Sequence, residues 1–332
     1  MPENTGTIAP LNWQALVDEA LRRRKAEKLT QREHAALASV SVPTIVAFDR
    51  GERTLSLAKA FDILRVVGLI EEQGKEGAQE VFVKEAFTRW RSLTAKLPAE
   101  SPGRFPKGWF RFDYVLDGEL REPSLSALEE IIQRSKIRLT GWPLFVSLNR
   151  PELAPREIDG VIECWVKPPE TGVERNFADA AHCDFWRAAP SGRFFVMRGY
   201  QEDSQEAVSP GTIFDTTLPV WRLAEGLLHA ARMAEALGAP NAEVSVRFRA
   251  LYTGLLGRTL RSLQGHTFFL DETPARSDEA MLETVVPAGK IEQTLDEIVY
   301  PLVSSLFERF SIANLSRDFV TAEITRFRSG RL

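Results

Sequence analysis

Apolar residues recur at helical spacing through the first seventy residues, and residues that favour helix ends interrupt them. Residues 11–27 carry leucine and alanine on one face, which predicts a first amphipathic helix. Thr30 and Glu33 have the spacing of a capping box, which begins a second helix. Alanines dominate the buried face predicted for this second helix, so a neighbouring helix can approach it closely.

Two further helices are predicted after residue 40. Ser41 is a good N-cap, and Pro43 is tolerated in the first turn because the amide there needs no partner. Gly51 lies where the third helix must end, in the position of a left-handed C-cap. Ser56 begins a fourth helix, so residues 1–70 are expected to form a small helical domain.

The pattern after residue 70 predicts a connection and then a different kind of domain. Residues 71–77 are polar, residues 81–97 have a helical pattern, and residues 97–108 are rich in proline and glycine. We therefore expect a linking helix and linker over 71–108, and a C-terminal domain over 109–332.

Residues 109–332 contain segments with the 3.6-residue period of helices and segments with the two-residue period of strands. Strands are predicted at 109–116, 160–166, 193–198 and 243–251, with a further strand at 319–327. Helices are predicted at 124–136, 218–237 and 291–310, the last being the final long helix. Because these elements alternate without regular βαβ spacing, the expected fold class is α+β for this domain, joined to an α-helical N-terminal domain.

Residues 11–69 contain a set of elements in a characteristic order, namely Leu29-Thr30-Gln31, Ala35, Val40-Ser41, Thr44-Ile45, Asp49-Arg50-Gly51 and Leu55. With these elements the segment resembles the Cro/phage-repressor (XRE-type) DNA-binding domain. The resemblance implies a helix-turn-helix fold that binds double-stranded operator DNA.

The resemblance also implies roles for individual residues. Gln31 corresponds to a position that touches the DNA backbone or supports a base-contacting neighbour. Arg50 and Arg53 would reach phosphates, and at least one arginine of Arg22–Arg24 would lie near the backbone. The recognition helix, which enters the major groove, begins at Ser41 and exposes Val42, Pro43, Thr44 and Ala47.

The recognition helix departs from the family pattern. Where the family often carries Gln, Ser or Arg, this chain has Val42, Pro43 and Ala47, which cannot form bidentate hydrogen bonds with bases. Thr44 is the only polar side chain expected on that face. Sequence discrimination would then rest on thymine methyl groups, DNA shape and phosphate contacts. The alternative is a domain that binds protein instead.

Charge favours the DNA-binding interpretation. The 332 residues carry a net charge of -4, yet residues 11–70 contain ten basic and seven acidic residues. A basic module on an acidic chain fits local contact with phosphates. No apolar run is long enough to span a membrane, the N-terminus does not resemble a secretory signal, and two cysteines make no disulfide framework. We expect a cytoplasmic protein.

Motifs for chemistry are sparse. No phosphate-binding, dinucleotide-binding, zinc-protease or nucleophile-elbow motif occurs, so neither catalysis nor a cofactor is expected. His182, Cys183 and Asp184 could together hold a metal or form a nucleophile and base, but adjacent side chains usually point in different directions. We interpret them as structural residues, and His229 as a packed or capping histidine.

Aromatic residues and arginines alternate between residues 142 and 221. Such residues can build a pocket for an anionic or planar molecule, a dimer interface, or simply a core. The candidate pocket residues are Trp165, Trp186, Arg187, Arg198 and Trp221. Residues 184–238 faintly resemble a region that follows Schlafen-type AlbA domains in bacterial proteins, which suggests a regulatory or docking module.

These observations together predict a transcription regulator. A single recognition helix covers only four or five base pairs, so a homodimer is expected. The C-terminal domain would dimerise the protein and sense a small-molecule or protein effector. The alternatives are an antitoxin-like protein-interaction factor, and a nucleotide-modifying C-terminal domain whose DNA binding serves autoregulation.

Overall fold

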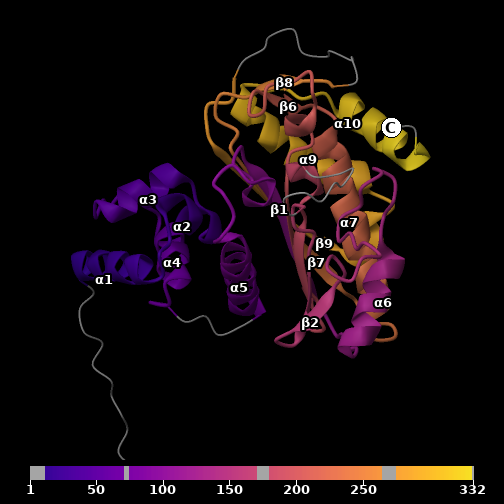
Figure 1. Cartoon of the computed structure of the whole chain (residues 1–332), viewed down its shortest axis with the longest axis horizontal. Coiled ribbons are helices and arrows are strands. Elements are labelled where there is room, and N and C mark those ends of the chain that lie inside the picture. The colour runs from indigo at the N-terminus through magenta and orange to yellow at the C-terminus, as the bar shows by residue number, and fades with distance from the viewer. Residues whose placement is uncertain (1–11, 71–74, 170–178, 264–273, 331–332) are drawn as a thin grey trace, which may run out of the picture. The chain divides into compact units, whose positions relative to one another are not determined.

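The computed structural model describes residues 12–70, 75–169, 179–263 and 274–330 (Figure 1). The chain forms two compact units, Met1–Lys84 and Glu85–Leu332. The first is helical, and the second combines an antiparallel sheet with helices, so the expected α-helical and α+β classes are confirmed.

The first unit contains the four short helices that the sequence predicts. Thr30 and Glu33 form the capping box in both directions, and the Ser41 side chain accepts a hydrogen bond from the backbone N–H of Thr44. Gly51 has φ +72°, the left-handed conformation expected after the third helix. The helices are α1 (Trp13–Ala26), α2 (Gln31–Leu37), α3 (Val42–Asp49) and α4 (Leu57–Val66), and a fifth, α5 (Lys75–Thr94), begins in this unit.

A buried ion pair fixes α3 against α1. Nη1 and Nη2 of Arg24 donate to the two carboxylate oxygens of Asp49 at 2.8 and 2.7 Å. Both side chains are about nine-tenths buried. Gln31, the first residue of α2, donates its side-chain amide to the same carboxylate at 2.7 Å. Asp49 therefore joins three helices by charge and hydrogen bonding, in addition to their apolar contacts.

The second unit is built on a seven-stranded sheet in the order β2-β3-β4-β5-β1-β7-β9. All of its neighbouring strands are antiparallel. β6 (Ile213–Asp215) and β8 (Thr259–Arg261) form a separate parallel pair. The bounds are β1 (Trp109–Asp117), β2 (Arg156–Ile158), β3 (Val161–Trp165), β4 (Phe185–Ala189), β5 (Arg193–Gly199), β7 (Ser245–Thr253) and β9 (Glu279–Pro287).

Helices cover one face of this sheet. Figure 1 shows α6, α7, α9 and α10 on the same side of the strands. Alternate residues of β1, such as Phe112 and Tyr114, point into a core shared with α7. At Gly226 of α7 a Cβ atom would lie 2.9 Å from the ring of Phe248, so glycine allows the helix to pack this closely. The helices are α6 (Leu125–Ser135), α7 (Leu218–Leu237), α8 (Ala288–Ile291), α9 (Leu295–Phe307) and α10 (Arg317–Ser329).

The opposite face of the sheet is also covered, in part by the C-terminal half of α5. Phe87 contacts Trp109 with ring centroids 5.9 Å apart, and Arg89 donates to Glu163 at 3.0 Å. Because this face of β1 is covered, Arg111 and Asp113 on it are fully buried. They form an ion pair, with Nε of Arg111 2.8 Å from Oδ1 of Asp113. Both faces of the central strands are therefore interior.

The boundary between the units lies in α5 instead of the proline- and glycine-rich segment. Residues 97–108 belong to the second unit, where Phe105 is buried and stacks on Trp90. The indole Nε1 of Trp90 also donates to the backbone oxygen of Gly103 at 3.1 Å. The proline- and glycine-rich segment is therefore an ordered part of the second unit, because Trp90 and Phe105 hold it in place.

The predicted strand over 319–327 is wrong. Residues 319–327 lie within helix α10, where Val320, Ile324 and Phe327 face the core at helical spacing. The helix predicted over 291–310 is present as α9, which begins four residues later at Leu295, but it is not the final long helix, because α10 follows it. The other predicted strands and helices of this unit are confirmed within a few residues at their ends. The sequence did not predict strands β4 and β9 or the three-residue strands β2, β6 and β8.

Removing the carboxylate of Asp49 should loosen the first unit selectively. Asp49→Ala leaves the buried Arg24 guanidinium without its counter-charge, which typically costs about 3–5 kcal/mol. We expect faster amide hydrogen exchange in α1–α3 of the full chain and no change in the sheet. Asp62→Ala, which breaks the more exposed pair with Arg65, is the control and should cost less than about 1 kcal/mol. Equal effects of the two variants would contradict this role of Asp49.

Candidate functional site

The outward surface of α3 is largely apolar. Ile45 and Phe48 point into the core of the first unit, which turns Pro43, Val46 and Ala47 towards the other side of the helix. Pro43 is exposed, while Val46 and Ala47 are half-buried. Sequence reasoning omitted Val46, although its position one turn after Val42 and Pro43 places it on the same surface.

The polar residues at the start of α3 are occupied with each other. The hydroxyl groups of Ser41 and Thr44 lie 2.8 Å apart, and the Ser41 hydroxyl also caps the helix. Val42 and Thr44 flank the outward surface and are half-buried. Thr44 is thus held in one orientation before any ligand arrives, and its remaining hydrogen-bonding capacity is limited.

Basic side chains differ sharply in their availability. Arg50 is 71% exposed, with one loose contact of 3.8 Å to Glu52. Arg53 is exposed in the turn that follows. In the row Arg22–Arg24, the last is buried against Asp49, and the first two both bind Glu19. Arg50 and Arg53, beside the end of α3, are therefore the better placed for an external phosphate.

The five candidate pocket residues of the second unit do not form one site. Trp186 is fully buried and donates its indole N–H to the backbone oxygen of Val146 at 2.7 Å. Arg187 and Trp165 lie on the opposite face of the sheet from Trp186, since they alternate with core residues. Arg198 and Trp221 lie on the helical side, where each lines a different one of two neighbouring cavities.

We call the first of these cavities the inner recess. It has about 30 Å³ of free space, room for about two water molecules. Four aromatic rings surround it, and neighbouring rings have centroids 5.6–6.4 Å apart. Its lining includes those rings, three charged residues and the start of α7, namely Phe110, Tyr200, Phe214, Tyr252, Arg198, Glu202, Arg222, Leu218 and Pro219.

The second cavity, the outer cleft, is larger and more polar. Its volume is about 410 Å³, within the range of small-molecule sites. Gln201 and Leu218 line both cavities, which makes them neighbours. The other lining residues are Leu139, Thr140, Gly141, Gln205, Asp215, Thr217, Trp221 and Leu263.

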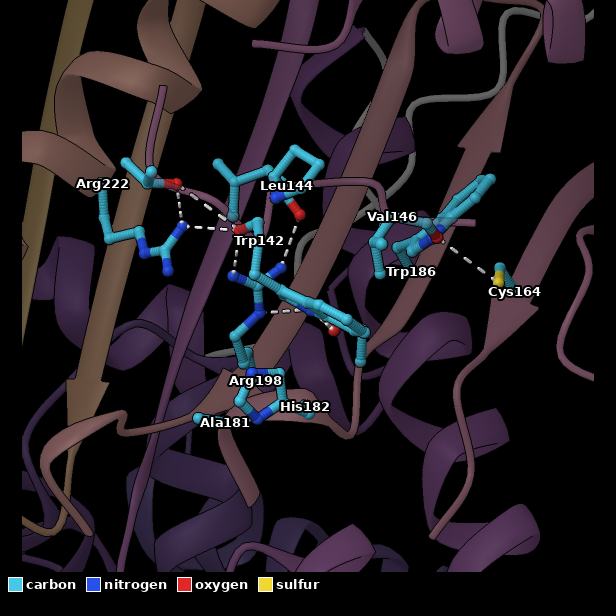
Figure 2. Close-up of polar contacts among 12 residues, drawn as sticks. Trp142, Leu144, Val146, Cys164, Ala181, His182, Trp186, Arg198 and Arg222 are labelled. Atoms are coloured by element: carbon cyan, nitrogen blue, oxygen red, sulfur yellow. Dashed lines mark hydrogen bonds and ion pairs between the residues drawn. The ribbon is translucent and has the colours of Figure 1, made fainter. Parts of the chain in front are cut away.

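Two arginines of the recess converge on one backbone oxygen. Arg198 and Arg222 donate to the carbonyl oxygen of Trp142 at 3.1 and 2.8 Å, as Figure 2 shows. Arg198 is also paired with Asp184, and Arg222 is paired with Glu225 at 2.9 Å. Each guanidinium charge is thus neutralised by its own carboxylate.

Glu202 differs from the other acidic residues around the recess. Its side chain is 2% exposed, and its Oε1 accepts a hydrogen bond from the backbone N–H of Asp215 at 3.0 Å. Within the described ranges no basic side chain forms an ion pair with it. Burial, together with the nearby charge of Asp215, raises the pKa of Glu202 to about 7. Glu202 lies in the short 3-10 helix Glu202–Ser204. The sequence around it did not indicate that its side chain would be buried.

The cluster at residues 182–184 does not converge. His182 binds Asp179 at 2.8 Å, Cys183 is fully buried, and Asp184 accepts from Arg198 and from the indole of Trp142. Across the described residues, no three His, Cys, Asp or Glu side chains are grouped to hold a metal ion. The structural interpretation of this cluster fits these contacts.

His229 and the cysteines also have structural surroundings. His229 is buried, and its Nδ1 lies 2.8 Å from the hydroxyl of Tyr114, so it is a packed histidine. Burial lowers its pKa to about 3. Cys164 and Cys183 are both buried, and neither forms a disulfide bond. No helix of the described ranges is long and apolar enough to cross a membrane.

The raised pKa of Glu202 predicts a specific pH dependence of stability. The folded state keeps the proton up to about pH 7, whereas the unfolded chain releases it near the ordinary value of 4.5. Stability from this group is therefore complete below pH 4.5 and is lost as pH rises to 7. Glu202→Gln does not titrate, so its stability relative to the native protein should rise by about 3 kcal/mol between pH 4 and pH 8. Denaturant unfolding at both pH values measures this, and a pH-independent difference would contradict it.

The two candidate surfaces are of different kinds. The surface at α3 is open, apolar at its centre and basic at its end. The inner recess is enclosed, aromatic and acidic at one point, next to a polar cleft. Comparison with protein-family models, with curated proteins and with solved structures found no match for this chain.

Proposed function

We propose that this protein is a sequence-specific transcription regulator that binds double-stranded operator DNA through a helix-turn-helix made by α2 and α3. The observation that carries the proposal is the surface at α3. This helix is fixed by Asp49 to α1 and α2, its outer side is open, and exposed Arg50 and Arg53 follow its last turn. A short helix of this kind fits the major groove, and flanking arginines fit phosphates.

The two helices have the local features that this role requires. Residues 38–41 connect α2 to α3, and hydroxyl caps at Thr30 and Ser41 define where each helix begins. Gln31 is exposed at the start of α2 but is bound to Asp49, so we assign it the supporting role that the resemblance allows. The wider charge pattern, basic residues over 11–70 on an acidic chain, directs DNA to this unit.

We further propose that the protein acts as a homodimer held by its second unit. One recognition helix reads too few base pairs for useful specificity, and a two-fold pair doubles the site. β9 is an outermost strand of the sheet, and its Val285 is 54% exposed. Such an edge can pair with another chain. This unit would also be where a small-molecule or protein effector acts.

Replacing Arg50 and Arg53 by alanine should weaken binding to every DNA sequence alike. Loss of each phosphate contact reduces the slope of log affinity against log salt by about 0.9. Fluorescence anisotropy at several salt concentrations measures both effects. Lys96→Ala with Arg156→Ala, two exposed basic residues of the second unit, removes the same charge elsewhere and should leave the slope unchanged. An unaltered slope in the Arg50/Arg53 variant would place the DNA elsewhere.

The apolar outer side of α3 predicts recognition of thymine methyl groups. Pro43, Val46 and Ala47 can contact a methyl group but cannot hydrogen-bond to guanine. Replacing a contacted thymine by uracil should cost roughly 0.8 kcal/mol, the value of one buried methylene. We expect this at one or more thymines in each half-site, and no effect for thymines outside. If every uracil substitution is silent, specificity comes from DNA shape or from other contacts.

A further inference from the structure

The inner recess shares no residue with the surface at α3. It lies entirely within the second unit, between β1, β5, β7 and the first turn of α7. Four aromatic rings, from Phe110, Tyr200, Phe214 and Tyr252, form its walls. Aromatic faces carry negative potential and attract cations.

The charged residues around the recess include one carboxylate that has no ion-pair partner in the described part of the chain. Three arginines border it or its walls, and each has its own carboxylate: Arg198 with Asp184, Arg222 with Glu225, and Arg258 with Asp203. Glu202 has no such partner among the described residues. The charge of Arg258 acts on Glu202, but Arg258 is already paired with Asp203. A buried carboxylate without an ion-pair partner of its own is unfavourable, so an additional positive charge beside Glu202 would be stabilising.

The hydroxyl of Tyr252 is a second polar group at the recess whose interactions are incomplete. The hydroxyl of Tyr252 is buried and makes no hydrogen bond to any residue in the described ranges. By contrast, the hydroxyl of Tyr200 is bound to the backbone oxygens of Trp109 and Thr253. Buried hydroxyl groups are nearly always satisfied, so the Tyr252 hydroxyl requires a bound molecule or water beside it.

The size of the two cavities limits the ligand. About 30 Å³ in the recess admits a head group of one or two heavy atoms. The outer cleft, with about 410 Å³ and amide and hydroxyl side chains, has room for a larger polar body. A head group that combines positive charge, hydrogen-bond donors and small size is a primary ammonium.

We propose that the recess binds the ammonium head group of a small organic amine, which donates to Glu202 and the Tyr252 hydroxyl between the four aromatic rings, while the rest of the molecule occupies the outer cleft. The amine is bound as a ligand and undergoes no reaction. Residues of strands β1, β5 and β7 of the central sheet form part of the wall of the recess. Binding therefore acts on the unit to which we assign dimerisation.

Titration calorimetry of the full chain with methylammonium and with ethylammonium tests the proposal, against sodium chloride and sodium acetate at the same ionic strength. We expect saturable binding of both ammonium ions and none of acetate. At pH 7 binding should also release protons, because a neighbouring cation lowers the pKa of Glu202. Calorimetry in two buffers of different ionisation enthalpy detects this release.

Two variants identify the groups involved. Glu202→Gln keeps the size of the side chain and should weaken ammonium binding at least about tenfold and abolish proton release. Tyr252→Phe should weaken binding several-fold without lowering the melting temperature of the free protein, because the hydroxyl has no partner to lose. Glu235→Gln, an exposed carboxylate on α7, is the matched control and should bind as the native chain does.

Three outcomes would overturn the proposal. Ammonium ions that bind no better than sodium would make the recess a water-filled structural cavity. Undiminished binding in Glu202→Gln would place the amine elsewhere. Binding of acetate that depends on Arg222 would show that the recess binds anions and not cations. None of these measurements involves DNA, so their result is separate from that of the DNA-binding experiments.

Discussion

The central strands of the sheet in the larger unit are buried on both faces, and this constraint governs where that unit places its charged side chains. A strand with one wet face can direct ionic side chains to water, but β1 and β7 cannot. Arg111, Asp113 and Arg249 are therefore held together, with Arg249 2.7 Å from Asp113. Because a lone buried charge costs several kcal/mol, each buried arginine of the sheet has a carboxylate close by.

The same requirement makes Glu202 and Tyr252 stand out. Their unit satisfies Arg198, Arg222 and Arg258 with both carboxylates and backbone oxygens. Beside the same cavity, Glu202 has a backbone hydrogen bond but no ion-pair partner among the described residues, and the Tyr252 hydroxyl has no hydrogen-bond partner there. A ligand that brings a positive charge to Glu202 and a hydrogen bond to Tyr252 would stabilise both groups, even though the recess is small.

In the smaller unit a single carboxylate has an equivalent role. Asp49 accepts hydrogen bonds from Arg24 and Gln31, which keeps α1, α2 and α3 in one arrangement. Two of the groups that could otherwise contact DNA are thereby used internally. The surface that remains is the apolar outer side of α3 with Arg50 and Arg53 after it. On our proposal, phosphate contacts would then provide most of the affinity, and methyl contacts the discrimination.

Local chemistry in the sequence was sufficient to locate the helices of the first unit, because Thr30, Ser41 and Gly51 act on backbone groups only a few residues away. It was also sufficient for β1, β7 and α7, whose apolar periods are long. It failed at α10, where β-branched and aromatic residues favour a strand locally but packing against α7 and α9 selects a helix. It also grouped Trp186 with Arg187, which the two-residue period of β4 places on opposite faces. Glu202 and Tyr252 are fifty residues apart, so only the tertiary fold could bring them to one recess: burial and the absence of a partner are properties of the assembled neighbourhood, and no single segment carries them.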